Sequence, residues 1–220
     1  MSGFNNLKTC LEITNDKKLK NPSGERNKEP ILEAIKQYID INSTKKLLEI
    51  SSGTGLHSSF FAGNFLSVTF QPTEYNVNLF QSIREYSKDF PENILEPIQV
   101  DISKHFDELD PLIKNEKFDY ILNINMIHIS PIECTHGLFA NSSKLLHSNG
   151  LLFTYGPYAV NGVLIPESNI RFNNMLKSDN PSWGIRDLKD LEIIAKSYQI
   201  ELVKVHDLPA NNKFVVWKKT

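Results

Sequence analysis

The sequence is poor in the features that stabilise or anchor a chain without a packed core. It has only two cysteines, Cys10 and Cys134, with neither a CxxC pair nor a zinc-binding spacing, which excludes a disulfide scaffold and a zinc finger. No apolar run approaches the roughly 18 residues that span a bilayer. Residues 1–20 lack the apolar segment of a secretory signal. Together with the unpaired cysteines, this predicts an intracellular, cytoplasmic protein.

Neither sign of charge predominates. The 24 Lys and Arg residues nearly balance the 26 Asp and Glu residues, for a net charge of −2, so a strongly basic nucleic-acid binder is excluded. The chain has 220 residues, 40% of them hydrophobic, which is enough for one globular core with additions. We therefore expect no nucleic-acid or membrane partner; the oligomeric state is left open.

Short apolar runs alternate about five times with helical periodicity. We expect strands at 47–50, 67–70, 97–100, 118–124 and 151–155, and helices at 27–39 (capped by Asn27), 56–64, 78–89, 131–147 and 187–198. This order predicts an α/β fold with a doubly wound, mostly parallel seven-stranded sheet. The runs 200–206 and 213–217 are joined by a short linker, which predicts an antiparallel C-terminal hairpin.

The predicted domain organisation follows from the same pattern. Residues 1–24 are expected to be a flexible arm, and residues 25–220 a single domain. The stretch 156–186 is expected to be an irregular insertion that forms part of a substrate wall.

A glycine loop after the first main strand is the most informative segment. Gly53 and Gly55 let the backbone approach a ligand at the start of a helix, a device of dinucleotide sites and of S-adenosylmethionine sites. The dinucleotide pattern needs a third small residue, and Ser58 stands there. With Glu49 four residues before the first glycine, the loop instead resembles motif I of class I S-adenosylmethionine-dependent methyltransferases. An ordinary strand–turn–helix corner is the alternative.

Two acidic residues follow the next strands. Glu74 comes after the second strand, where a carboxylate accepts from both ribose hydroxyls; the turn 71–73 is expected to separate strand and acid. Asp101 follows the third strand, where class I methyltransferases often place an Asp for the adenine amino group. A solvated loop acid is the alternative for Glu74, and a capping role for residues 102–103 is the alternative for Asp101.

The stretch after the fourth strand is the predicted reaction edge. His128 is a candidate general base because the histidine pKa ordinarily lies near neutrality, and a half-buried His bonded to backbone is the alternative. Asn125 and Tyr158 are predicted to orient the reactants, and for Asn125 a role in satisfying the end of the strand is the alternative. The stretch lacks the Asn/Asp-Pro-Pro-aromatic tetrapeptide of amino-base methylation. Glu133 and His136 lie three residues apart on a predicted helix without a third ligand, so no metal site is predicted.

Further polar and aromatic candidates lie in the insertion and the last hairpin. Aromatic side chains supply rigid pocket walls, and an arginine binds carboxylates or phosphates; for Arg186 an ion pair with Asp187 or Asp190 is the alternative. His57 lies just past the glycines, where it lines the cofactor pocket or serves the helix start. The predicted substrate-binding residues are Tyr155, Asn169, Trp183, Arg186 and Asn211.

The motifs together resemble methyltransferase-like protein 26, a family formerly described as a domain of unknown function. The resemblance covers residues 24–220 and is carried by 25–32, 48–55, 125–131, 154–158, 168–169, 183–187 and 208–212. It implies a class I methyltransferase fold and S-adenosylmethionine as cofactor, with S-adenosylhomocysteine as product, but no substrate. It also places Arg26 and Asn27 over the cofactor. The predicted cofactor-binding residues are Arg26, Asn27, Glu49, Ser51, Gly53, Gly55, Glu74, Asp101, Asn123 and Asn125.

Three hypotheses follow. The first is a methyltransferase acting on a small molecule or a small exposed nucleophile, with His128, Asn125 and Tyr158 as catalytic residues. The second is a module that binds the cofactor or a partner without catalysis. The third, a nicotinamide oxidoreductase, is disfavoured by Ser58 and Glu49.

Overall fold

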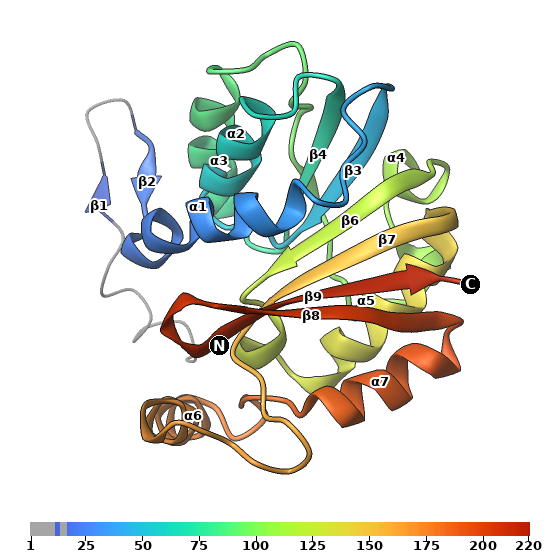
Figure 1. Cartoon of the computed structure of the whole chain (residues 1–220). Coiled ribbons are helices and arrows are strands. Elements are labelled where there is room, and N and C mark those ends of the chain that lie inside the picture. Colours follow the sequence, from blue (N-terminus) through green and yellow to red (C-terminus); the bar gives the residue numbers. More distant parts are fainter. Residues whose placement is uncertain (1–11, 14–16) are drawn as a thin grey trace.

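A seven-stranded sheet forms the centre of the computed structural model, which describes residues 12–13 and 17–220. The strand order is β5-β4-β3-β6-β7-β9-β8 (Figure 1). The strands are β3 (Lys45–Ile50), β4 (Val68–Glu74), β5 (Ile98–Gln99), β6 (Phe118–Ile124), β7 (Leu146–Gly156), β8 (Ile200–Leu208) and β9 (Asn212–Lys219). The first five of these run parallel, and β9 lies antiparallel between β7 and β8. The predicted sheet and C-terminal hairpin are confirmed.

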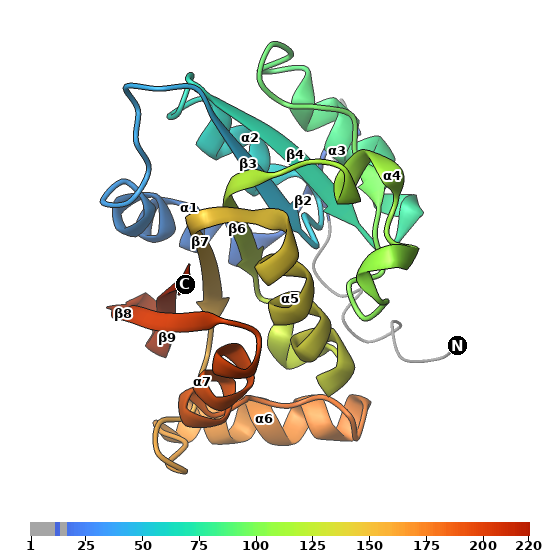
Figure 2. The same cartoon turned by 90° about the vertical axis from the view of Figure 1, so that its right-hand side faces the viewer.

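Helices cover both faces of this sheet. They are α1 (Pro22–Ile35), α2 (Leu56–Ala62), α3 (Phe80–Ser87), α4 (Pro111–Lys114), α5 (Ile132–Leu145), α6 (Glu167–Asp179) and α7 (Leu188–Ser197). One buried cluster joins the sheet to α4, α5 and α7, and a second joins it to α1 and α2. These two groups of helices lie on opposite sides of the sheet (Figure 2). Single turns of 3-10 helix are η2 (Val77–Leu79), η3 (Phe106–Glu108), η4 (Ile127–Ile129) and η5 (Pro209–Asn211). No described helix combines the length and the apolar character needed to cross a bilayer.

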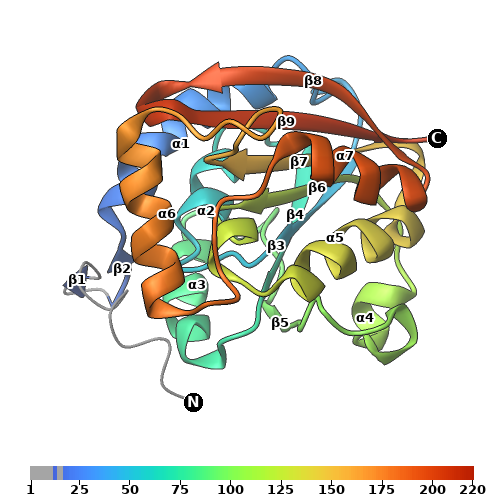
Figure 3. The same ribbon diagram turned by 90° about the horizontal axis from the view of Figure 1, so that it is seen from below.

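The switch point of the sheet lies between β3 and β6. From β3 the chain winds outward through β4 and β5, and from β6 it winds the other way through β7. In such sheets the crevice at the carboxyl ends of the two central strands is the usual ligand site. Helix α6 lies beyond the carboxyl ends of β6 and β7 (Figures 1 and 3).

Helix α1 begins earlier than predicted. Asn21, not Asn27, caps it by accepting from the Ser23 amide at 2.9 Å, and Pro22 occupies the first turn. Pro30 is therefore inside the helix and not in its first turn. Of the predicted flexible arm, residues 1–11 and 14–16 lie outside the described residues. The strands β1 (Glu12–Ile13) and β2 (Leu19–Lys20) pair antiparallel just before the helix.

Two other sequence expectations need correction. The predicted turn at 71–73 is part of β4, which continues to Glu74. Pro72 is accommodated because β5 pairs only with Thr73 and Glu74, so no β5 partner requires an amide from Pro72. The insertion is not wholly irregular, since it contains α6. That helix has no side-chain cap and buries only Asn169 and Leu176. The two usual sequence signals of a helix, a capping residue and a periodic set of apolar residues, are therefore weak there.

Candidate active site

The glycine loop leaves β3 through residues with positive φ. Ser51 (60°), Gly53 (58°) and Gly55 (91°) all lie in this region. At Gly55 an added Cβ would lie 2.7 Å from the Cα of Ile83 on α3, so a side chain is excluded by contact as well as by conformation. At Gly53 an added Cβ would meet nothing within 4 Å. The loop is therefore pressed against α3 at one glycine and open at the other.

Glu49 lies beneath this loop. Its carboxyl is 1% exposed, and burial raises its pKa to about 7. The hydroxyl of Ser58 donates a hydrogen bond to it. Ser58 occupies the third small position of the dinucleotide pattern, so the departure from that pattern supplies a partner for the buried acid.

Glu74 contacts the glycine loop directly. Its two carboxylate oxygens accept from the Gly53 amide at 2.9 Å and the Asn76 amide at 3.0 Å. The residue is 7% exposed, and burial raises the pKa of the carboxyl, partly offset by these amides. The fold thus joins two candidates that the sequence could place only at the same sheet edge.

Asp101 has the alternative role that the sequence left open. One of its oxygens accepts from the amide of Ser103 at 3.0 Å and from its hydroxyl at 2.6 Å, as a cap does. Asp101 also lines a cavity of about 200 Å³, together with Tyr75, which follows Glu74, and with Val100. A role toward adenine stays a prediction.

Asn123, near the carboxyl end of β6, and Asn125, just after the strand, lie at the switch point. The Asn123 amide donates to the Ile50 carbonyl at 3.0 Å, which links β6 to β3, while its Oδ1 atom is buried without a hydrogen-bond partner among the described residues. Asn125 adopts a positive φ of 63°, and its backbone amide donates a hydrogen bond to the Tyr155 carbonyl at 2.8 Å. An unpartnered buried acceptor is costly unless a ligand or water satisfies it.

His128 lies within the reaction edge but is much less basic than expected. It is 5% exposed; burial, followed by the charge of Arg186, lowers its pKa to about 3. An added Cβ at Gly156 would lie 3.2 Å from its Nδ1, and the ring of Phe172 on α6 contacts it edge-on. The expectation of a pKa near neutrality was wrong because the imidazole is enclosed, and it is uncharged at neutral pH.

Residues of α1 meet the end of β7. Asn27 is buried, and its Oδ1 lies 2.7 Å from Nε2 of His57. Burial raises the pKa of the Tyr155 phenol, and the side chains of Asn212 and Asn27 and the charge of Arg26 oppose this shift. The two α1 residues therefore lie beside the predicted substrate wall as well as the glycine loop.

Arg186 is directed to backbone carbonyls. Its guanidinium donates to Ser130 at 3.0 Å and to Ser182 at 2.8 Å, while its Nε is buried without a hydrogen-bond partner in the described structure. The alternative ion pair is not formed, since the Asp187 carboxylate accepts from the amides of Gly162 and Lys189. Binding of an anionic substrate group by Arg186 stays a prediction.

Of the remaining predicted residues, Tyr158, Asn169 and Trp183 are buried around the insertion, whereas Asn211 is exposed. The Tyr158 hydroxyl meets no partner at hydrogen-bond geometry among the described residues; burial raises its pKa, and the side chain of Thr154 opposes this shift. Asn169 of α6 donates to the Ile165 carbonyl at 3.1 Å and to the Asn211 carbonyl at 3.5 Å, which joins the insertion to the C-terminal hairpin.

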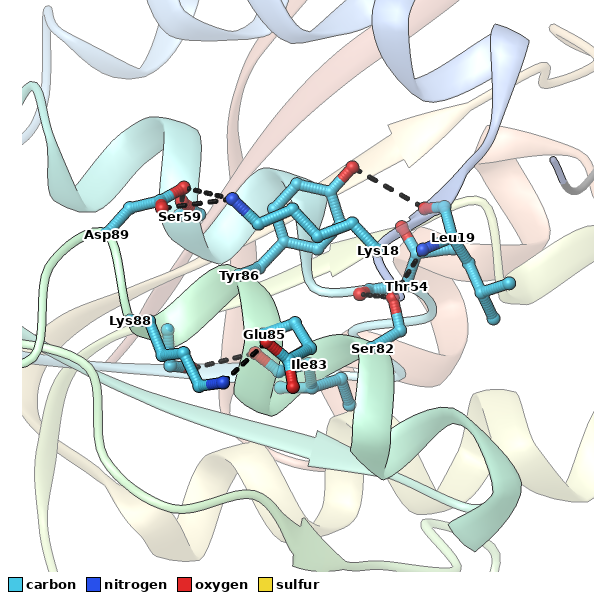
Figure 4. A network of polar contacts seen from close by, with 11 residues as sticks. Lys18, Leu19, Thr54, Ser59, Ser82, Ile83, Glu85, Tyr86, Lys88 and Asp89 are labelled. Atoms are coloured by element: carbon cyan, nitrogen blue, oxygen red, sulfur yellow. Dashed lines mark hydrogen bonds and ion pairs between the residues drawn. The ribbon is translucent and has the colours of Figure 1, made fainter. Parts of the chain in front are cut away.

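Sequence reasoning missed several residues that contribute to the candidate site. Phe172 contacts His128 but lies in no motif, and Asn212 contacts Tyr155 but is only the last residue of the motif 208–212 and is not among the predicted site residues. Ser82 of α3 binds the glycine loop from outside any motif (Figure 4). In the described ranges, no three His, Cys, Asp or Glu side chains come together in a way that could hold a metal ion.

Comparison with solved structures defines the class of fold. The pyocyanin biosynthetic protein PhzM is 11% identical, with a TM-score of 0.69 over 91% of this chain and 60% of PhzM. CalO1, a methyltransferase in calicheamicin biosynthesis solved in its S-adenosylhomocysteine-bound form, is 11% identical, with a TM-score of 0.72 over 90% of this chain and 54% of CalO1. The chain thus spans little more than half the length of either protein.

A third structure matches over nearly its whole length. A candidate sarcosine dimethylglycine methyltransferase from Galdieria sulphuraria is 12% identical, with a TM-score of 0.70 over 96% of this chain and 91% of that one. The chain therefore has the Rossmann-like fold of methyltransferases. The family model described as protein of unknown function, DUF938, matches residues 18–219, and the chain belongs to this family.

Proposed function

We propose that this chain is an S-adenosylmethionine-dependent methyltransferase that acts on a small molecule or a small exposed nucleophile. The contact between Glu74 and Gly53, at 2.9 Å, carries the proposal. It sets a buried carboxylate against a glycine-loop amide beside the switch point. Two amides occupy only part of the acceptor capacity of a carboxylate, so acceptor positions remain for a ribose diol.

The other features of the crevice fit the rest of the cofactor. The open space at Gly53 admits a ligand against the backbone. The unpartnered Oδ1 of Asn123 suits the methionine ammonium group, and Arg26 suits its carboxylate. The cavity beside Asp101 and Tyr75, about 200 Å³ against about 30 Å³ for a water molecule, suits the adenine ring.

The residues proposed to contact the methyl acceptor orient it more than they act as a strong base. S-adenosylmethionine, when bound, provides a sulfonium methyl group open to in-line displacement. Asn125 and the unpartnered Tyr158 hydroxyl hold the nucleophile in our proposal. The neutral His128 ring accepts a hydrogen bond from the hydroxyl, thiol or amine group of this nucleophile. A hydroxyl oxygen becomes strongly acidic as it gains a methyl group, so a base with a pKa of about 3 can still take the proton.

The finer family assignment is part of this proposal. The motifs at 125–131 and 183–187 support a place in the methyltransferase-like protein 26 group. The edge-on contact of His128 with Phe172 joins the stretch after β6 to α6, and this supports an enclosed pocket for a small acceptor. The likeness to CalO1, solved with S-adenosylhomocysteine, supports the choice of cofactor.

Calorimetric titration tests cofactor binding. We expect S-adenosylmethionine and S-adenosylhomocysteine to bind and NAD not to bind. Gly53→Arg should abolish binding. Gly162→Arg is the matched control, because Gly162 also has a positive φ and open space around an added Cβ but lies in the insertion. Equal binding by the parent and Gly53→Arg would place the cofactor elsewhere, and no binding by the parent would refute the proposal.

A non-catalytic cofactor-binding module is the second candidate. The low pKa and the burial of His128 favour it, because an enclosed, weakly basic ring is also what a purely structural histidine shows. Release of S-adenosylhomocysteine in a screen of small hydroxyl, thiol and amine acceptors separates the two candidates. In an active enzyme His128→Ala should lower turnover and leave cofactor affinity nearly unchanged; an equal loss of both would refute its catalytic role.

A further inference from the structure

Residues Lys18–Lys20, called the strap here, lie against α3 just before α1 (Figure 4). The Lys18 ammonium binds both oxygens of Asp89, at 2.9 and 2.7 Å, and lies 5.0 Å from the centre of the Tyr86 ring. The Tyr86 hydroxyl donates to the Leu19 carbonyl at 3.5 Å. The strap is thus held by side chains that belong to no sequence motif.

One hydroxyl joins the strap to the glycine loop. Ser82 of α3 accepts from the Leu19 amide at 2.9 Å and donates to the Thr54 carbonyl at 2.8 Å. Thr54 stands between the two glycines of the loop, and Ser82 is 1% exposed. The adjoining Ile83 is the residue that Gly55 approaches. A buried hydroxyl that accepts one hydrogen bond donates its own more strongly, so the two contacts support each other.

The strap also leads directly into α1. Lys20 is followed by Asn21, the cap of the helix that carries Arg26 and Asn27. The strap is therefore connected to the glycine loop through Ser82 and to α1 through the chain itself.

We propose that the strap and Ser82 position the glycine loop for cofactor binding, with Ser82 as a positioning residue that acts through Thr54. This inference rests on the proposed function, since the cofactor is S-adenosylmethionine. Linkage makes the effect reciprocal: if an attached strap favours the cofactor-binding loop, bound cofactor must hold the strap by the same factor.

Two variants and two matched controls test this inference. Ser82→Ala removes the bridging hydroxyl, and Lys18→Met keeps the aliphatic stem but removes the ion pair. Ser87→Ala removes an α3 hydroxyl whose partner within the described structure is the Ile83 carbonyl. Lys88→Met removes the ion pair with Glu85 of α3 (Figure 4). We expect Ser82→Ala to weaken S-adenosylhomocysteine binding about five- to tenfold and Lys18→Met about threefold, with both controls within about twofold of the parent.

Hydrogen exchange at the Leu19 amide provides a readout that a loss of general stability would not imitate. In the parent, S-adenosylhomocysteine should slow this exchange by a factor equal to the ratio of the affinity of the parent to the affinity of Ser82→Ala for this ligand. In Ser82→Ala the slowing should disappear, while the Ser87→Ala control keeps it.

The outcomes are distinguishable. If the parent does not bind S-adenosylhomocysteine, the proposed function fails and this inference fails with it. If the parent binds but Ser82→Ala binds equally well, or the ligand leaves Leu19 exchange unchanged, only the strap inference is overturned. Should Ser82→Ala not fold, Lys18→Met decides the matter through the same two measurements.

Discussion

At the scale of single residues, buried polar pairs determine how the crevice is built. Glu49 and Ser58 illustrate this, because a fully buried carboxyl is stable only with a partner that stays in place. The pair also shows why the loop departs from the dinucleotide pattern. In the folded chain the pKa of the Glu49 carboxyl is about 7, above its ordinary value of 4.5. The contribution of Glu49 to stability is therefore present below pH 4.5 and is lost as the pH rises to 7.

Ser58→Ala should destabilise the chain in a pH-dependent manner. The hydroxyl stabilises the carboxylate form, so its loss raises the pKa of Glu49 further and costs more where that form predominates. We expect a loss of about 1–3 kcal/mol above pH 8 and clearly less at pH 5.5, measured by urea unfolding. An equal loss at both pH values would show that Ser58 acts through packing alone.

Arg26→Gln should weaken the binding of ligands that carry the methionine carboxylate. We expect about a tenfold loss of affinity for S-adenosylhomocysteine and none for methylthioadenosine, which lacks the amino-acid end. Lys36→Gln, on the same helix but paired with Glu33 at its far end, is the control. A parallel loss for both ligands would assign Arg26 to shaping α1 and not to holding the carboxylate.

At the scale of elements, buried strands were the most predictable part. The expected strand 118–124 matches β6, since its run of apolar residues is buried on both faces. The start of α1 and the presence of α6 were not predictable to the same degree. Asn21 and Asn27 are both good caps in isolation, and tertiary packing buries Asn27 against His57. The meeting of Glu74 with Gly53 likewise depends on how far β4 continues past Pro72.

The position of the α1 cap gives a direct test at this scale. Asn21→Ala removes the acceptor of the Ser23 amide and should cost about 1 kcal/mol of unfolding free energy, while Asn21→Asp should retain most of it. Thermal unfolding of the three proteins measures the difference. If the two variants are equally stable, the helix does not depend on this cap.

At the scale of the whole molecule, two histidines with lowered pKa values make stability depend on acidity. Burial lowers the pKa of His57 to about 4 and that of His128 to about 3, both below the ordinary 6.5. The folded chain therefore binds fewer protons at these sites than the unfolded chain does. Their contribution to stability is present above pH 6.5 and is lost as the pH falls toward these values.

His128→Gln should therefore lose less stability than the parent between pH 7 and pH 5. The glutamine has no proton to gain in the unfolded state, which removes one source of acid lability. Urea midpoints at the two pH values provide the comparison, with the exposed His147→Gln as the control. If the urea midpoint of His128→Gln falls as steeply between pH 7 and pH 5 as that of the parent, the buried, neutral state of His128 is contradicted.

The last strand of the sheet has a consequence for how copies of this chain meet. Strand β8 forms the outer edge, and its register against β9 shifts between Leu202 and Lys204. The exposed side chains there include Glu201 and Lys204. An interrupted, charged edge is a poor template for a strand from another molecule. The sheet is thus protected along β8 against pairing with a strand of another copy of the chain.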